Sequence, residues 1–303
     1  KLPERWRKYW TYPYYPGYEN VGTVVKVGKD VKDVKVGDRV LHYGPHAEYC
    51  VAPRDDVLPG YVKIPDSVSD EDAILALLGT TALWAIHRSE LEYGDKVIVL
   101  GDGALGILVA LHAKNAGADK VILVGNHAGK LKIAKQVGVD VVVNHKEKDW
   151  QEQAMAETDG LGADIVFECV GSSIEPTGAV REASEVARQR GKVVIVGDHM
   201  AGQPDLILCS DPYFKELTFI MSRATGPGSH HPALMEHLNA VQKYNYVKWT
   251  TQGLLERVLS MIASGKLNVH PLITHRFKYT EVAEVFKRLN EKKEDFIKVI
   301  LTW

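Results

Sequence analysis

The sequence predicts an α/β fold in which a β-rich domain accompanies a doubly wound parallel sheet. Short β-branched runs between Gly22 and Pro53, separated by glycine and charged residues, are typical of antiparallel strands. From Asp95 to about Gly197 strands and helices alternate, and the strands are apolar enough to be buried on both faces. The length of 303 residues exceeds the usual size of one domain and favours two separate cores.

Composition and charge limit the partners of this chain. The formal net charge of -2 gives no electrostatic reason to expect a nucleic acid or an anionic membrane as partner. The longest nearly apolar run, residues 74–86, is too short to span a bilayer and predicts a buried helix. The N-terminal KLPERWRKYW lacks the apolar stretch of a secretory signal, and three distant cysteines give no disulfide framework. We therefore expect a cytoplasmic protein with a small-molecule substrate.

The β-rich region is expected to contain three strands and to end near Pro65. The runs GTVVKVG, DRVLHY and AEYCVA predict the strands. After Pro65, the stretch DSVSDEDAILALL predicts a helix. Its Asp and Ser residues, among them Ser69, can cap the first backbone N–H groups, and the acids that follow suit the positive end of the helix dipole.

The parallel sheet is predicted from five strands with a helical segment between each pair, namely KVIVL, KVILV, DVVVN, ADIVFEC and KVVIVG. LTFIMS, residues 217–222, predicts another strand, and the remainder of 204–250 has the composition of loops. A helix over LLERVLSMIASGKL, the strand LITHRF, a helix over TEVAEVFKRLN and a last strand IKVILTW complete the chain.

A glycine turn follows the strand KVIVL and opens the next helix. Gly101 allows a tight turn, Gly103 lets the backbone approach a pyrophosphate, and Gly106 lets the helix pack on the strand. The helix N-terminus, with Ala104 and Leu105, would face the anion. An isolated match of this kind could be a plain connection, but its place in a repeated strand–helix series favours dinucleotide binding.

The end of the following strand bears on the choice between NAD and NADP. An NAD site normally has an acidic residue there that binds the ribose 2′-hydroxyl. Gly125 stands at that place, followed by Asn126, His127 and Lys130, none of which would repel a 2′-phosphate. The sequence therefore favours NADP. The alternative is that Asn126 and His127 are turn and helix-cap residues and that NAD binds through other contacts.

Six motifs together resemble the medium-chain dehydrogenase/reductase superfamily of zinc-type alcohol dehydrogenase-like proteins: GYENVGTVVKVG, VGDRV, HAEYCVAP, GTTALWAI, VIVLGDGALG and IKVIL. The resemblance implies a GroES-like catalytic domain, 1–75 and 247–303, interrupted by a Rossmann NAD(P)-binding domain, 76–246. GYENVG, YGPHAEY and LITHRF are most similar to the hydroxyethyl bacteriochlorophyllide dehydrogenase-like subgroup. Fewer residues precede Tyr18 than in the family, so we expect an abbreviated catalytic domain, natural or truncated.

The resemblance also bears on zinc, which needs about three N, S or O side chains and an open position in a catalytic site. Zinc-dependent relatives use an upstream cysteine, a histidine before the glutamate of GHE, and a cysteine or glutamate in the helix after the β-domain. Here Tyr18 replaces the histidine, and the helix region is the aliphatic 75–79. The short segment 42–46 replaces the cysteine-rich lobe, so we expect no zinc. His42 and His46 form the one rival pair of ligands, although their spacing favours hairpin residues.

Without a metal, a hydrogen-bond donor or general acid must stabilise charge on the substrate oxygen. Tyr18 is the first candidate because it replaces a ligand, and the alternative is that it fills the space left by zinc. Glu19 could position groups around the nicotinamide or make a buried ion pair. His46 is a weaker candidate for a proton relay. Thr81 could donate to cofactor or substrate, although threonine in an apolar helix often bonds its own backbone.

Further cofactor contacts are implied where two later strands end, because ligands of such sheets bind at the carboxyl ends of strands. These positions are Cys169, Val170, Gly171, Gly197 and Asp198. Lys298 matches a basic position that often reaches the cofactor, and its alternative role is that of a solvated lysine. The pair His230 and His231 favours a surface turn over a metal site.

These observations predict a zinc-independent, NADP-preferring oxidoreductase that transfers hydride between a nicotinamide and an alcohol or carbonyl carbon. One alternative is reduction of an activated carbon–carbon double bond, as in quinone and enoyl reductases. The other is a nucleotide-binding protein without turnover, or a subunit that acts through a partner. The family implies a homodimer, formed here through the strand 217–222.

Overall fold

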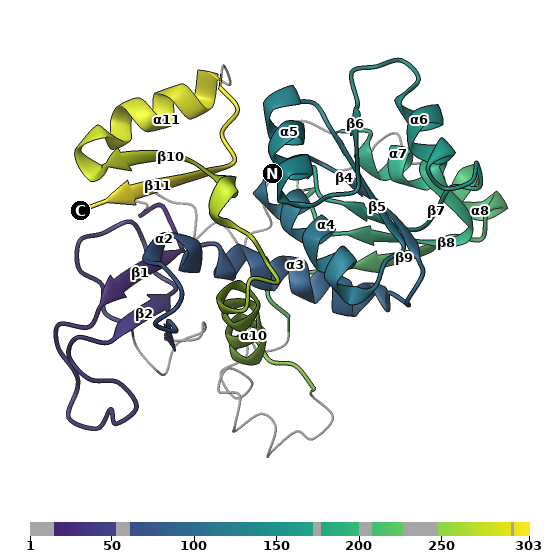
Figure 1. Ribbon diagram of the computed structural model, residues 1–303. Helices are drawn as coiled ribbons and strands as arrows, with labels where there is room; N and C mark the ends of the chain where they lie inside the picture. Colours follow the sequence, from purple (N-terminus) through teal and green to yellow (C-terminus); the bar gives the residue numbers. More distant parts are fainter. Residues whose placement is uncertain (1–14, 53–60, 172–176, 200–207, 227–247, 292–293) are drawn as a thin grey trace. The chain divides into compact units, whose positions relative to one another are not determined.

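The computed structural model describes residues 15–52, 61–171, 177–199, 208–226, 248–291 and 294–303 (Figure 1). The chain divides into two compact units. The first is Lys1–Leu77 with Pro227–Ala263, and the second is Leu78–Gly226 with Ser264–Trp303. This division groups 264–303 with the parallel sheet, and the assignment of the C-terminal segment to a GroES-like domain stays a prediction.

The first unit contains an antiparallel sheet, as the β-branched runs predict. Strands β1 (Asn20–Thr23), β2 (Arg39–His42) and β3 (Val62–Lys63) pair in the order β1-β2-β3. Leu41, fully buried in the central strand, lies opposite Val21 on one side and Val62 on the other. The apolar face of β2 therefore forms the centre of this small sheet.

The strand predicted from AEYCVA is wrong, because residues 47–52 form no strand in the structure. Tyr49 is 71% exposed and Val51 is 88% exposed, so the apolar side chains of this run are not packed against the small sheet. A β-branched run becomes a strand only where a neighbouring strand and a packed face stabilise it.

Two helices complete the described part of the first unit. Helix α2 (Asp70–Ala73) begins after Ser69, whose side chain accepts a hydrogen bond from the Asp72 N–H at 3.0 Å, as a helix cap should. Helix α10 (Thr251–Ala263) buries leucine and valine side chains against α2 and β3. The helix predicted from residues 74–86 is also present, as α3 (Ala76–Ser89), and all but its first two residues belong to the second unit.

The second unit is organised around a six-stranded sheet in the order β6-β5-β4-β7-β8-β9, in which all neighbours are parallel. Its strands are β4 (Lys96–Leu100), β5 (Lys120–Gly125), β6 (Val141–Asn144), β7 (Ala163–Glu168), β8 (Ala187–Ile195) and β9 (Thr218–Met221). The chain order reverses beside β4, so the loops after β4 and β7 diverge there. Ligands of doubly wound sheets bind at such a reversal.

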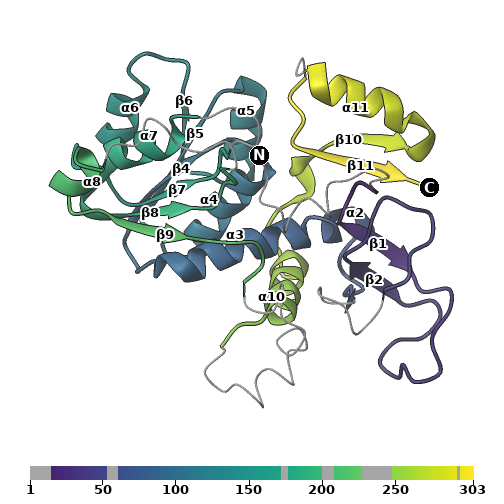
Figure 2. The same cartoon turned by 180° about the vertical axis from the view of Figure 1, so that it is seen from behind.

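The helices between these strands are α4 (Ala104–Ala116), α5 (Ala128–Val137), α6 (Trp150–Ala156) and α7 (Ala179–Val186), and a short helix α8 (Asp211–Phe214) precedes β9. Because parallel crossovers are right-handed, α4 and α5 cover one face of the sheet and α6 and α7 the other (Figures 1 and 2). The predicted α/β alternation is confirmed. Both faces of the central strands are therefore buried.

The C-terminal segment forms a smaller parallel pair, β10 (Ile273–Lys278) and β11 (Lys298–Thr302), joined through helix α11 (Val282–Glu291). Short 3-10 turns, η2 (His270–Leu272) and η3 (Tyr279–Glu281), flank β10. The strands and helix predicted here are confirmed. In the part of the chain that the structure describes, no helix is long and apolar enough to cross a bilayer.

Candidate functional site

The glycine turn after β4 is shaped by two close backbone approaches. Gly101 has a φ of +113°, which side chains rarely allow, and a Cβ there would lie 3.0 Å from the carbonyl of Cys169. A Cβ at Gly106 would overlap the carbonyl oxygen of Gly101 and lie 2.9 Å from its carbon. These two glycines are required by packing of the turn against β7 and of α4 against the turn.

Gly103 differs from Gly101 and Gly106 because no contact within the protein requires a glycine at this position. Its φ is -73°, and a Cβ there would meet no atom within 4 Å. It precedes α4, and no side chain caps the helix, whose first residues include Ala104 and Leu105. The first backbone N–H groups of a helix attract anions. The open space at Gly103 is where a pyrophosphate could approach them.

A buried acid joins the carboxyl ends of β7 and β8. Glu168 is fully buried, and its Oε1 accepts hydrogen bonds from the N–H groups of Val170 at 2.7 Å and Gly171 at 3.0 Å. Its Oε2 lies 2.6 Å from Nε2 of His199, which follows β8. The Glu168 side chain thereby fixes Val170 and Gly171, which follow β7.

The predicted contact residues of these two strand ends lie together. A Cβ at Gly197 would come 2.5 Å from the Gly171 nitrogen, and one at Gly171 would come 2.9 Å from the Asp198 nitrogen. Burial and the neighbouring Glu168 raise the pKa of the Cys169 thiol well above its ordinary value. This thiol therefore stays protonated and can line a site without acting as a nucleophile.

The end of β5 is occupied by a side chain from the glycine turn. A Cβ at Gly125 would lie 2.5 Å from Cγ of Asp102, overlapping the carboxylate. Asp102 is only 6% exposed, and its Oδ2 accepts a hydrogen bond from the His127 N–H at 2.7 Å. The His127 ring nitrogen Nδ1 lies 3.1 Å from both carboxylate oxygens. The predicted helix-cap place of His127 is thus linked to the glycine turn.

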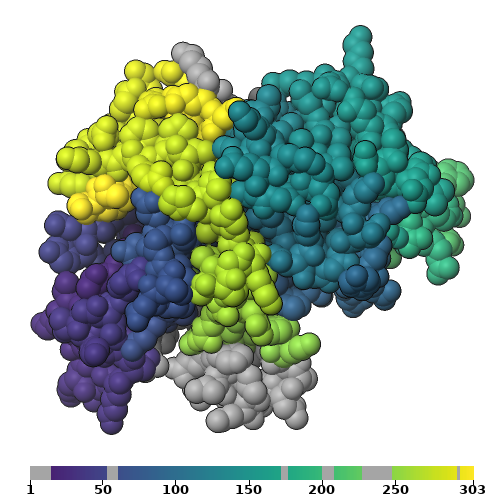
Figure 3. Space-filling model, viewed as in Figure 1, coloured from purple at the N-terminus to yellow at the C-terminus, as the bar shows by residue number. Residues whose placement is uncertain are grey.

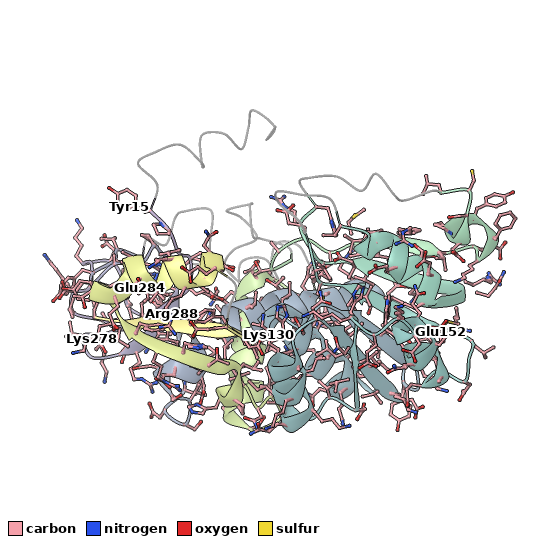
Figure 4. All side chains as sticks on the ribbon, turned by 90° about the horizontal axis from the view of Figure 1, so that it is seen from above. Tyr15, Lys130, Glu152, Lys278, Glu284 and Arg288 are labelled. Carbon is pink, nitrogen blue, oxygen red and sulfur yellow. The ribbon has the colours of Figure 1, made fainter. Side chains whose placement is uncertain are left out.

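The remaining predicted cofactor residues are Asn126, Lys130 and Lys298. Asn126 is exposed, and Lys130 is half-buried in the first turn of α5, where Figure 4 labels it. Lys298 begins β11 and pairs with β10, so it belongs to the two-stranded sheet and not to the six-stranded one. The Thr274 hydroxyl donates to its carbonyl at 3.2 Å. Lys298 therefore stays a prediction based on resemblance.

Three of the four predicted catalytic residues lie together in the first unit. Tyr18 stacks on Tyr43, with ring centroids 6.3 Å apart and planes inclined by 24°. The His46 ring lies against Gly17, where a Cβ would come 2.5 Å from Nε2, and the His46 N–H donates to the Pro16 carbonyl at 2.7 Å. These contacts hold segment 42–46 beside the entrance to β1.

Two side chains of this region, Tyr18 and His42, have pKa values shifted toward the neutral form. Desolvation raises the pKa of the Tyr18 phenol above its ordinary value of 10, with smaller contributions from Glu19 and Tyr43, although 54% of the residue surface is exposed. Burial lowers the pKa of His42. At neutral pH, Tyr18 is a phenol that can donate a hydrogen bond. Half-buried Thr81, the fourth predicted catalytic residue, lies on α3 in the other compact unit.

The described residues at two of the zinc positions implied by the family resemblance have side chains that do not suit the ion. Tyr18 supplies a phenol of raised pKa, and residues 75–79 offer only aliphatic side chains and glycine. Within the described ranges, no group of three or more histidine, cysteine or acidic residues could hold a metal. His42 turns its Nδ1 to the Tyr43 carbonyl at 3.0 Å. His230 and His231 lie outside the described residues.

Sequence reasoning missed four residues whose side chains make contacts near these strand ends: Asp102, Glu168, His199 and Asp295. The Oδ2 of Asp295 accepts a hydrogen bond from the Gly129 N–H at 3.1 Å. Asp102 lies between two glycines of the turn, and Glu168 ends a buried strand. A charged residue in either place is a signal that could have been used, because buried acids need partners. The identity of those partners requires the sheet.

Two family models match this chain. The model of the alcohol dehydrogenase GroES-like domain matches residues 3–66, and that of the zinc-binding dehydrogenase matches residues 104–240. Sorbitol dehydrogenase of Halalkalibacterium halodurans is 27% identical over 319 residues, which cover 96% of this chain and 83% of the relative.

Solved structures of the same fold contain either nicotinamide cofactor. A zinc-binding dehydrogenase from Sinorhizobium meliloti bound to NADP has a TM-score of 0.75 at 22% identity, over 97% of this chain and 84% of the other. A short chain alcohol dehydrogenase from Escherichia coli complexed with NADH has a TM-score of 0.72 at 20% identity, over 96% and 85%. These likenesses show the fold.

Proposed function

Because the chain belongs to the zinc-type alcohol dehydrogenase-like medium-chain dehydrogenase/reductase superfamily, we propose that it transfers hydride between NAD(P) and an alcohol or carbonyl substrate without zinc. The observation that carries the proposal is the glycine turn. Gly101 and Gly106 are needed for packing, whereas Gly103 leaves open space at the uncapped N-terminus of α4. Binding of a dinucleotide pyrophosphate in that space would explain why residue 103 is a glycine.

The protein would contribute binding and orientation. Backbone N–H groups at Ala104 and Leu105 would bind the pyrophosphate, and the loop held by Glu168 would lie beside the second half of the cofactor. The nicotinamide supplies the hydride chemistry when bound. Both NAD and NADP fit the turn, which meets only the pyrophosphate. The predicted preference for NADP rests only on the residues at the end of β5, where Gly125 replaces the acid of an NAD site.

Zinc independence is supported by the chemistry of the replaced positions. Tyr18 stands where relatives have a histidine, and its raised pKa keeps the proton on the phenol. A preorganised hydrogen-bond donor can stabilise negative charge on a carbonyl oxygen in the transition state. We assign that role to Tyr18, a proton relay to His46, and supporting positions to Glu19 and Thr81. The subgroup resemblance extends the proposal to secondary alcohols and ketones.

The test compares Y18F with Y43F, a matched control that removes a hydroxyl from the ring stacked on Tyr18. Secondary alcohols, ketones, enones and quinones are assayed with both nicotinamide cofactors. We expect kcat of Y18F to fall by about 100-fold or more, the size of a general-acid contribution, with Y43F changed little. Unchanged kcat in Y18F, or stoichiometric zinc in the purified protein, would contradict the proposal.

The substrate panel also separates the alternatives. Turnover of enones or quinones alone indicates reduction of a carbon–carbon double bond. Tight nucleotide binding with no turnover of any substrate indicates a nucleotide-binding protein or a partner-dependent subunit. Either result would replace alcohol oxidation as the reaction of this chain.

We further propose that the chain forms a homodimer through β9. This strand lies at one edge of the six-stranded sheet, where the predicted segment 217–222 is found, and Met221 is 65% exposed. An exposed edge strand is a template for pairing. Light scattering is expected to give twice the mass of 33.6 kDa, and a monomer would contradict the interface.

A further inference from the structure

The acid that is missing from the end of β5 is supplied by the glycine turn. Asp102 extends from the turn to Gly125, and its carboxylate fills the space that a side chain at Gly125 would need. The residue is 6% exposed, so its position is fixed by packing. The two places for an acid exclude one another sterically, because a Cβ at Gly125 would lie 2.5 Å from Cγ of Asp102.

The backbone donors at the N-terminus of α5 are already bonded to carboxylates. The His127 N–H donates to Asp102 at 2.7 Å, and the Gly129 N–H donates to Oδ2 of Asp295 at 3.1 Å. Asp295 comes from the C-terminal segment, which meets the region of α5 in the space-filling view (Figure 3). Two acids from distant parts of the sequence thus converge on one helix end.

Two basic side chains also lie near this helix end. The His127 ring lies 3.1 Å from both oxygens of the Asp102 carboxylate, so any charge on the ring is offset by that acid. Lys130 is half-buried one turn along α5. The carboxylates of Asp102 and Asp295 lie at the same helix end, and they already accept hydrogen bonds from backbone N–H groups that a phosphate would use. The local balance is therefore unfavourable to a further dianion.

We propose that Asp102, assisted by Asp295, selects NAD over NADP. The inference rests on the proposed binding of a nicotinamide cofactor at the glycine turn, which places the adenosine ribose near the end of β5. A 2′-phosphate there meets two negative charges and finds the His127 and Gly129 N–H groups occupied. A 2′-hydroxyl meets neither obstacle. The cofactor preference expected from Gly125 alone is thereby reversed.

The first test measures dissociation constants for NADH and NADPH by calorimetry on the wild-type protein, D102N and D119N. Asn is isosteric with Asp and keeps an oxygen for the His127 N–H. Asp119 immediately precedes β5 at its opposite end, so D119N makes the same charge change about 20 Å from Gly125 along the strand. We expect tighter NADH binding by the wild type, a shift of roughly tenfold toward NADPH in D102N, and none in D119N.

Tighter NADPH binding by the wild type would overturn the inference, as would an unchanged NADH to NADPH ratio in D102N with an unchanged melting temperature. A shift of similar size in D119N would also overturn it, because the effect would be one of net charge. Failure of the wild type to bind either nucleotide would instead contradict the proposed function.

A second test moves the acid back to the strand. D102G should lose the preference for NADH, and D102G/G125D should regain it, because removal of the Asp102 side chain frees the space at residue 125. G125D alone should lower the melting temperature, since both side chains then compete for one place. If a folded D102G/G125D protein does not regain the preference for NADH, the assignment of cofactor selection to Asp102 is contradicted.

Discussion

Two acid–histidine pairs stand at the carboxyl edge of the same sheet, and they differ in their access to solvent. Glu168 and His199 join β7 to β8, with side chains exposed by 0% and 11%. Asp102 and His127 join β4 to β5, and the His127 side chain is 41% exposed. In each pair the acid accepts at least one backbone N–H group and lies within hydrogen-bond distance of the histidine ring.

This difference separates a structural role from recognition. The Glu168 carboxylate is enclosed and holds three donors, so its contribution is to fix the loop after β7. The Asp102 pair has one face toward solvent, where a ligand can approach. We therefore assign the Glu168 pair to stability and the Asp102 pair to recognition of the cofactor.

The largest expected effect belongs to the enclosed pair. E168A removes the acceptor of two backbone N–H groups and of His199, leaving buried donors without a partner. We expect a loss of about 3–5 kcal/mol in the apparent free energy of unfolding, measured by urea titration. D102A removes the acceptor of one backbone N–H group and the partner of the partly exposed His127 ring, so it should cost less, about 1 kcal/mol.

The comparison fails if D102A destabilises the protein as much as E168A does. That result would make Asp102 a structural residue in the same sense as Glu168. E157A is a suitable control, because Glu157 pairs with Lys120 at 2.9 Å and both side chains are more than a third exposed. Its effect should stay within about 0.5 kcal/mol.

The sequence predicts the backbone of the site well and its side chains poorly. Gly101 and Gly106 are identified from spacing alone because each must lack a side chain for close backbone packing, Gly101 against the end of β7 and Gly106 against the turn itself. The link between Asp102 and Gly125 depends on two strands that the sheet places side by side. Periodicity carries no information about that contact.

The predicted strand over residues 47–52 fails for a related reason. Its residues have high β propensity, but Tyr49 and Val51 remain exposed. Propensity is local, whereas pairing needs a second segment in register. The same reason explains why Asp295, far along the chain from α5, was not recognised as part of the candidate site.

The glycine turn gives the most direct test of the central claim, that a dinucleotide binds where Gly103 leaves open space. A Cβ at Gly103 meets no protein atom within 4 Å, so G103A should fold with an unchanged melting temperature. Calorimetry should show NADH binding to the wild type and binding at least roughly tenfold weaker to G103A, because the methyl group occupies the pyrophosphate's place. Equal affinity of the two proteins for NADH would contradict the account.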